Sequence, residues 1–204
     1  MVSTRIGILA LSHQKNYRLY SKTNYKIRTL AMWLKDKLFG SKKKQETVSL
    51  CIPDETLAIL ETDDLEGAKA LMVVNRALME HQDDSVLKRV FGYYCSIIFD
   101  YVDVDDNMWP STDEFAIMHD YVETFDKGLK GLPEHPNALF VARVTHNGTC
   151  QMIWMLHNAQ TAIEYLDKII AEGNEVRCFE YHVEGDPEWK SIEWFLQDFP
   201  SENQ

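Results

Sequence analysis

Much of the architecture follows from one stretch near the C-terminal end, Phe179-Glu180-Tyr181-His182-Val183-Glu184-Gly185-Asp186-Pro187-Glu188-Trp189-Lys190-Ser191-Ile192-Glu193-Trp194-Phe195-Leu196. Its first residues alternate apolar and polar side chains, which is typical of a half-buried strand. Asp186 can then cap a helix, and Pro187 suits a first helical position because that position needs no backbone donor. We therefore predict a strand, a tight corner and a closing helix. The rest of the chain is expected either to pack on this unit or to repeat it.

Charge is divided unevenly along the chain. The 204 residues carry a net charge of −11, yet residues 1–45 hold 11 of the 21 Lys and Arg and only one acid, Asp36. The remainder has 10 basic and 31 acidic residues, a net charge of −21. A body this acidic repels nucleic-acid phosphates, so nucleic-acid binding is not expected, whereas a basic protein partner would be attracted to it.

Residues 1–46 are predicted to form a basic, poorly ordered leader. The first 31 residues show no steady period, whereas residues 32–39 predict a short amphipathic helix that Gly40 ends. Residues 32–44 would either hold the protein at a membrane surface or only add solubility. We favour the second, because two helical turns bind a bilayer weakly. Met32 is also a candidate start, which leaves open whether residues 1–31 belong to the native protein.

Cysteine usage and hydropathy predict a cytoplasmic protein. The four cysteines are widely spaced and form no Cys-x-x-Cys pair, so reduced thiols are expected at Cys51, Cys95, Cys150 and Cys178. The longest apolar runs are much shorter than the roughly 20 residues of a membrane-spanning helix.

Strands and helices are predicted in the same order in two halves of the chain. Residues 47–132 predict strands at 47–52 and 56–61, a helix over 63–81, a strand over 90–104, and a helix opened by a capping box at Ser111 and Glu114. After a boundary at 131–137, residues 137–199 predict strands at 138–146 and 149–156, a helix from Asn158 to Gly173, a strand over 175–184 and the closing helix. Asn147-Gly148 between the two apolar strands predicts a tight hairpin, because both residues tolerate positive φ.

The second half resembles the first when the chain is shifted by 80 residues. Residues 95–115 and 175–195 then share six identities in 21 positions, including Phe99 with Phe179 and Trp109 with Trp189. Duplication and chance similarity both remain open. We predict an α+β fold of two similar halves, each an antiparallel sheet with helices on one face, ferredoxin-like in character. If the duplication is real, a pseudo-twofold axis relates the halves.

Residues 142–148, the apolar strand and helix that follow, and Asp186-Pro187-Glu188-Trp189 together resemble the family catalogued as domain of unknown function 695. The acidic helix start at residues 109–114 is also similar to that family's pattern. The resemblance covers roughly residues 47–196 and implies a bacterial intracellular protein without an established activity. Members of the family are sometimes joined to a domain similar to the ribonuclease E regulator, which is not evident here.

Several groups of polar residues are candidates for chemistry, but each also has a structural explanation. Residues 103–114 carry oxygen ligands at the spacing of a calcium loop, yet Met108 stands where that loop needs glycine, so a capped acidic corner is favoured. Trp109 and Trp189 could flank a ligand or pack helix starts on the sheet, and we favour packing. Glu180 and His182 share a strand face with Glu184, which is either an acid/base group or an exposed polar face.

No catalytic or phosphate-binding motif occurs, and no cofactor or metal is expected. The favoured hypothesis is a non-enzymatic binding or regulatory module whose acidic surface meets a basic protein. The alternatives are an enzyme or small-molecule binder with a cleft between the halves, and a peripheral membrane protein anchored by residues 32–44. The candidate ligand or partner residues are Trp109, Glu180, Tyr181, His182, Asp186 and Trp189.

Overall fold

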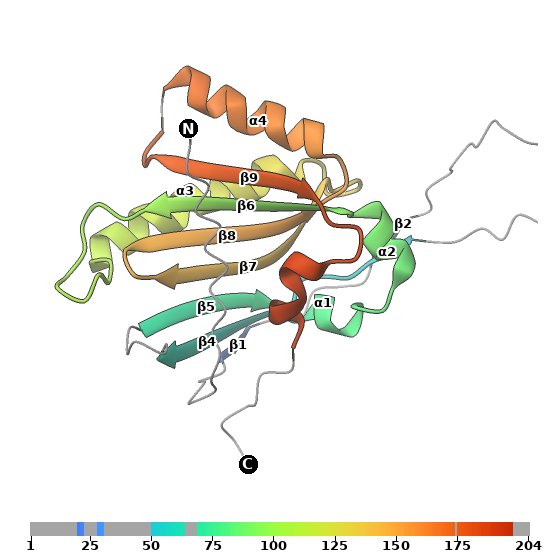
Figure 1. The fold of residues 1–204 in the computed structure, drawn as a ribbon, viewed down its shortest axis with the longest axis horizontal. Helices are drawn as coiled ribbons and strands as arrows, with labels where there is room; N and C mark the ends of the chain where they lie inside the picture. Colours follow the sequence, from blue (N-terminus) through green and yellow to red (C-terminus); the bar gives the residue numbers. More distant parts are fainter. Residues whose placement is uncertain (1–19, 23–27, 31–49, 64–68, 174, 198–204) are drawn as a thin grey trace, which may run out of the picture.

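The computed structural model describes residues 20–22, 28–30, 50–63, 69–173 and 175–197. Its centre is one antiparallel sheet of seven strands in the order β1-β4-β5-β7-β8-β6-β9 (Figure 1). These strands are β1 (Tyr20–Lys22), β4 (Leu57–Asp63), β5 (Lys69–Asn75), β6 (Tyr93–Asp100), β7 (Ala138–His146), β8 (Thr149–Leu156) and β9 (Phe179–Gly185). The helices are α1 (Ala77–Glu80), α2 (Ser85–Val90), α3 (Thr112–Lys130), α4 (Ala159–Glu172) and the 3-10 helix η1 (Lys190–Leu196). The predicted α+β class is confirmed.

A βαββαβ unit forms the larger part of this sheet. In chain order it runs β6-α3-β7-β8-α4-β9, and its strands lie side by side as β7-β8-β6-β9. Each helix connects two parallel strands across one intervening strand, which is the split βαβ arrangement of ferredoxin-like folds. The predicted ferredoxin-like character is therefore present. However, the unit spans both predicted halves, and the predicted boundary at residues 131–137 lies inside it, between α3 and β7.

The sequence predicted two sheets, one in residues 47–132 and one in residues 137–199. In the structure, strands of both segments lie in the same seven-stranded sheet. Strand β6 comes from the first of these segments but lies between β8 and β9 of the second. Cys95, Ile97 and Phe99 of β6 are fully buried on one face, and Ser96 is buried on the other. Burial on both faces stabilises a strand in the middle of a sheet. Strand β6 accordingly lies between β8 and β9, which come later in the chain. The strand order also has no twofold axis that exchanges the two predicted halves.

The predicted helix over residues 63–81 is wrong over most of its length. Residues 69–75 form β5, which pairs with β4 on one side and β7 on the other. The apolar run from Ala70 to Val74 is compatible with the periodicity of a helix and with that of a strand. Pairing with β4 and β7 on its two edges stabilises the strand. Of the described residues in this range, only those of α1 form a helix. Residues 85–89, for which the sequence predicted no element, belong to α2, whose first amides donate to the Asp84 carboxylate at 2.9 and 3.0 Å.

Most of the local signals are confirmed. Ser111 caps α3 by accepting from the Glu114 amide at 3.2 Å, and Asn158 caps α4 by accepting from the Thr161 amide at 3.3 Å. Asn147 and Gly148 have φ of 45° and 77°, as the predicted hairpin between β7 and β8 requires. Gly173 ends α4 in the left-handed conformation.

The basic leader is only partly described. Tyr20–Lys22 forms β1 on the outer side of β4, and β2 (Arg28–Leu30) pairs with β3 (Leu50–Ile52) outside the seven-stranded sheet. These two strands correct the expectation that the first 31 residues lack structure. The predicted amphipathic helix at residues 32–39 and the anchor at residues 32–44 lie outside the described residues. Within the part of the chain that is described, no helix combines the length and apolar character of a membrane crossing.

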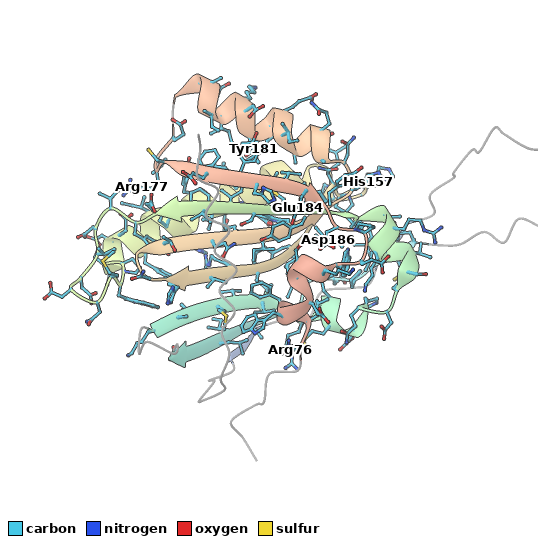
Figure 2. The ribbon with its side chains drawn as sticks, viewed as in Figure 1. Arg76, His157, Arg177, Tyr181, Glu184 and Asp186 are labelled. Carbon is cyan, nitrogen blue, oxygen red and sulfur yellow. The ribbon has the colours of Figure 1, made fainter. Side chains whose placement is uncertain are left out.

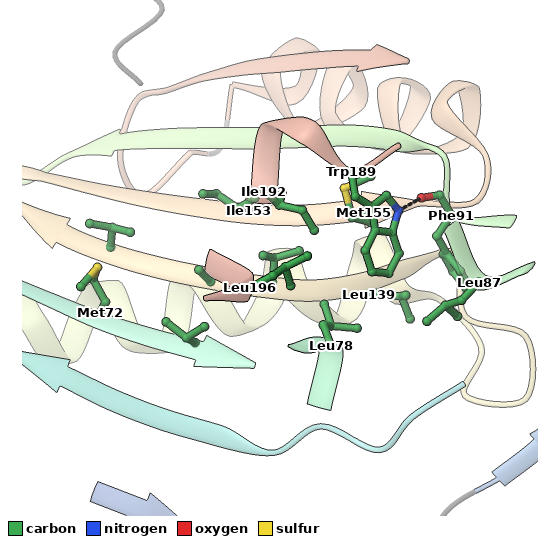
Figure 3. Packing of buried hydrophobic residues seen from close by; sticks show 14 of the residues in the cluster. Met72, Leu78, Leu87, Phe91, Leu139, Ile153, Met155, Trp189, Ile192 and Leu196 are labelled. Atoms are coloured by element: carbon green, nitrogen blue, oxygen red, sulfur yellow. Dashed lines mark hydrogen bonds between the residues drawn. The ribbon is translucent and has the colours of Figure 1, made fainter. Parts of the chain in front are cut away.

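The sheet carries a hydrophobic core on each face. Helices α3 and α4 cover one face, where Phe99, Phe125 and Trp154 are fully buried. On the other face η1, α1 and α2 close a second core around Trp189 (Figure 3). The Trp189 indole packs among Leu87, Leu139 and Met155, and its Nε1 donates to the Phe91 carbonyl at 2.8 Å.

The corner before η1 follows from Asp186 and Trp189. The Asp186 carboxylate accepts from the amides of Lys190 at 2.9 Å and Ser191 at 2.8 Å, so it binds the first turn of the closing helix as predicted. The start of that helix is corrected, because η1 is a 3-10 helix that begins at Lys190, with Trp189 and not Asp186 as its N-cap residue, and Pro187 lies before it. Trp189 has φ of 60°, which a non-glycine residue adopts only at a cost. Because its side chain is only 1% exposed, burial of the indole compensates for the backbone strain. The structural interpretation of Trp189 is therefore correct.

We expect Trp189→Phe to lower the free energy of unfolding by about 2–3 kcal/mol, because it removes the hydrogen bond to Phe91 and leaves a cavity. Urea unfolding followed by circular dichroism measures this change. Trp109→Phe is the matched control at a half-buried position, with an expected loss of about 1 kcal/mol or less. Equal losses in the two variants would contradict the anchoring role of Trp189.

The four cysteines differ in accessibility, and none of them forms a disulfide. Burial raises the pKa of Cys95 to about 12 and that of Cys150 to about 11, whereas Cys178 is exposed. We expect Ellman's reagent at pH 8 to modify Cys178 within minutes and Cys95 and Cys150 only after unfolding in urea. Cys178→Ser would remove the fast phase. Rapid modification of all four thiols in the native protein would show that the core is not closed.

Candidate functional site

The site candidates of the sequence centre on β9, whose side chains alternate between two environments. Glu180, His182 and Glu184 are exposed on the face that carries η1. We call these three residues the β9 row. Phe179, Tyr181 and Val183 point to the opposite face and pack against the core beneath α3 and α4. The predicted alternation of this strand is confirmed, and it directs two carboxylates and an imidazole to the same exposed surface.

Strand β6 adds polar neighbours to the β9 row. Its pairing with β9 sets Ser96 opposite His182 and Tyr94 opposite Glu184. The Gln151 side chain, on β8, donates to Ser96 Oγ at 2.9 Å, and the rings of Tyr94 and His182 lie 6.4 Å apart. Burial raises the pKa of Tyr94, so its hydroxyl stays protonated and can donate or accept at neutral pH.

Glu184 connects this surface to η1. Its Oε2 lies 3.3 Å from His182 Nε2, and its Oε1 accepts from the Ser191 hydroxyl at 3.3 Å. A nucleophilic serine needs a histidine between its hydroxyl and the carboxylate, so that the histidine can take the proton. Here the carboxylate lies between serine and histidine. The arrangement presents hydrogen-bonding groups at a surface, but it does not activate Ser191.

The other candidates of the sequence lie elsewhere. Tyr181 donates to the Asp167 carboxylate on α4 at 2.5 Å, on the face opposite the β9 row, and the Asp186 carboxylate binds the first turn of η1 (Figure 2). Trp189 is buried at the end of β9. Trp109 follows β6, which runs antiparallel to β9, and so lies beyond the opposite end of the strand pair. The two tryptophans therefore do not flank a common cleft.

The acidic segment of residues 103–114 is closed by its own hydrogen bonds. Asp105 Oδ1 accepts from the amides of Trp109 and Asn107, both at 2.9 Å, and these bonds lower the pKa of Asp105. Glu114 binds Arg177 through both carboxylate oxygens and also accepts from the Val102 amide at 3.0 Å. Only half of the predicted capping box is therefore formed: Ser111 caps α3, but its own amide donates to the Asp103 carbonyl and the Glu114 carboxylate binds Arg177 and Val102 instead. Within the described ranges, no group of three His, Cys, Asp or Glu side chains is arranged to hold a metal ion.

Comparison with known proteins gives one result, which spans most of the folded region. A model of a family of unknown function matches residues 59–197, from β4 to the end of η1. The chain belongs to this family, DUF695. No curated protein and no solved structure matches the chain. The resemblance predicted from the aromatic and turn residues is thus confirmed, and the match includes the β9 row and the corner at Asp186.

The sequence alone does not single out Tyr94, Ser96, Gln151 or Ser191 as site residues. Tyr94 and Ser96 are more than 80 residues from the β9 row in sequence and approach it only through the pairing of β6 with β9. One local signal was present for Gln151, a polar residue within an otherwise apolar strand. Such a residue indicates a polar partner across the sheet.

Glu114 gives a test of the buried ion pair in this DUF695 protein. Its side chain is 2% exposed and that of Arg177 is 17% exposed, so Glu114→Gln should lower the free energy of unfolding by about 2–4 kcal/mol at pH 7. Hydrogen bonding to Arg177 lowers the pKa of Glu114 below its ordinary value. The ionised carboxylate therefore stabilises the folded state above pH about 4.3, and this stabilisation is lost as the pH falls through the lowered pKa.

Urea unfolding at pH 7 and at pH 3 measures both effects. The difference between wild type and Glu114→Gln should shrink at the lower pH. Glu134→Gln, at an exposed position, is the control. Its free energy of unfolding should stay within about 0.5 kcal/mol of the wild-type value at pH 7 and at pH 3. A difference of the same size at pH 7 and pH 3 would contradict the role of the ionised carboxylate.

Proposed function

We infer that this DUF695 protein is a non-enzymatic binding module that recognises a basic surface of another protein through the β9 row. The observation that carries this inference is the state of its carboxylates. Within the described residues, neither Glu180 nor Glu184 makes an ion pair with lysine or arginine, and both are exposed. Some carboxylates elsewhere do have such partners, in the pairs Glu114 with Arg177, Glu123 with Lys127, Asp126 and Glu55 with Lys130, and Glu172 with Lys168. What sets Glu180 and Glu184 apart is that their exposed charges lie on one strand beside the exposed His182.

The surroundings of the β9 row strengthen its negative potential. Between residues 179 and 197 the exposed charged side chains are those of Glu180, Glu184, Glu188, Glu193 and Lys190. The whole chain after residue 45 has a net charge of −21, from 10 basic and 31 acidic residues. Such a field accelerates encounter with a basic partner and repels nucleic acid, so a protein is the partner class we favour.

Catalysis is the weaker alternative on physical grounds. Glu184 lies between Ser191 and His182, which is not the order of a proton relay to a nucleophile. The alternative of a cleft between two halves loses its basis, because β6 lies between two strands of the second half. Membrane anchoring rests on residues 32–44, outside the described residues. We place the protein in the cytoplasm, an assignment that its free cysteines support.

The double variant Glu180→Gln/Glu184→Gln tests this function. Tagged wild-type protein should capture a specific basic protein from lysate of its source cells at 20 mM salt, and the variant should recover about tenfold less of it. The control Asp120→Asn/Glu134→Gln removes the same charge from exposed positions on α3 and the connection after it, and it should bind as wild type does.

Quantitative mass spectrometry of the captured proteins, at 20 and 200 mM salt, provides the measurement. Thermal unfolding of all three proteins checks that the substitutions leave the fold intact. Recovery of the same proteins in equal amounts by wild type and the β9-row variant, or the absence of any specific basic partner, would overturn the inference.

A further inference from the structure

We propose that the outer edge of β9 accepts an extended basic segment of a partner protein, which adds to the sheet as an eighth strand. This proposal rests on the proposed function and specifies how the β9 row is used. It commits to a segment with lysine or arginine at alternate positions, because such a segment would place its positive side chains beside Glu180 and Glu184.

Strand β9 is at the end of the sheet. One of its edges pairs with β6 over seven consecutive positions, from Phe99 with Phe179 to Tyr93 with Gly185. Among the described strands none pairs with its other edge. The backbone N–H and C=O groups that point outward from such an edge can bind an extended peptide.

Helix α4 packs against β9 beside this edge: it lies beyond β9 in Figure 1, and the Tyr181 hydroxyl donates to Asp167 on it. Phe179, Tyr181 and Val183 of β9 are only partly buried, whereas Cys95, Ile97 and Phe99 face the same core from β6 and are fully buried. At the end of the strand, a Cβ added to Gly185 would meet no atom within 4 Å. An added strand thus has partly buried apolar side chains to cover on one face.

The other face of the added strand would contact the β9 row. Side chains on neighbouring strands that point to one face lie about 5 Å apart, so every second residue of the segment would lie beside Glu180, His182 or Glu184. Opposite charges at such positions stabilise the pairing and like charges destabilise it. A segment with basic residues on this face and apolar residues on the other matches both faces of β9.

A second copy of the chain is a poorer occupant. Antiparallel pairing of two β9 strands over their full length, centred on His182, would set Glu180 opposite Glu184 twice. Parallel pairing in register would set each glutamate beside its own copy. Both arrangements bring like charges together on an edge whose backbone is otherwise free to pair. The charges of the β9 row therefore select a basic segment and oppose self-association.

A synthetic peptide provides the test, with the sequence Thr-Lys-Val-Lys-Val-Lys-Thr blocked at both ends. Its binding to the full-length protein is measured by fluorescence anisotropy at 20 mM salt. The comparison peptide has identical side chains but N-methyl groups on its five central amides, so it keeps the charge and cannot donate strand hydrogen bonds from those five positions. We expect it to bind at least about tenfold more weakly. Amide hydrogen exchange should slow at outward-pointing positions of residues 179–185 with the first peptide alone.

The outcomes distinguish strand addition at β9 from the proposed function, which is recognition of a basic protein surface. Equal binding of the two peptides, or no added protection in β9, would overturn strand addition. If Glu180→Gln/Glu184→Gln still weakened binding in that case, recognition of basic surfaces by charge would stand. Light scattering that detected a wild-type dimer, dispersed by Val183→Lys, would also overturn the proposal by assigning the edge to a second copy.

Discussion

The buried indole of Trp189 is the contact on which the closing part of the fold depends. It holds η1 on the sheet through a hydrogen bond to the Phe91 carbonyl, 98 residues earlier in the chain. The left-handed backbone at Trp189 costs about 1–2 kcal/mol, and full burial of a tryptophan contributes more than this. Asp186 then orders the first amides of η1. The end of β9 is therefore held rigidly, and Glu184 has a defined position next to Ser191.

The central position of β6 determines where polar groups meet. Because β6 is buried on both faces, it takes the interior place in the βαββαβ unit and leaves β9 at the edge. The same pairing brings Tyr94 and Ser96 beside His182 and Glu184. A surface of hydrogen-bonding groups thus arises at the boundary between a rigid sheet and a free edge. Such a boundary favours recognition of extended peptides, since the backbone of the edge is already ordered before binding.

Electrostatics distinguishes this edge from the acidic sites at Glu114 and Asp105. Glu114 is buried and neutralised by Arg177, and its role is to join α3 to the segment before β9. Asp105 is satisfied by amides of its own loop. Glu180 and Glu184 instead retain solvated charge on a strand that lacks an outer neighbour among the described residues. Solvated carboxylates on an exposed edge protect it from uncontrolled pairing, and in the proposed mode of binding they also select a positively charged partner.

The sequence by itself determined the features that depend on neighbouring residues. The caps at Ser111 and Asn158, the bonds of Asp186 to the first turn of η1 and the hairpin at Asn147 each require hydrogen bonds or backbone angles within about five residues, so local chemistry is sufficient. The family, the α+β class and the polar face of β9 could also be predicted, because local residue patterns and periodicity carry these signals. Tertiary structure alone decided that residues 69–75 form a strand, that β6 lies between β8 and β9, and that Tyr94 lies beside the β9 row. These features depend on contacts between distant segments, and an apolar run that suits either a strand or a helix adopts whichever its neighbours stabilise.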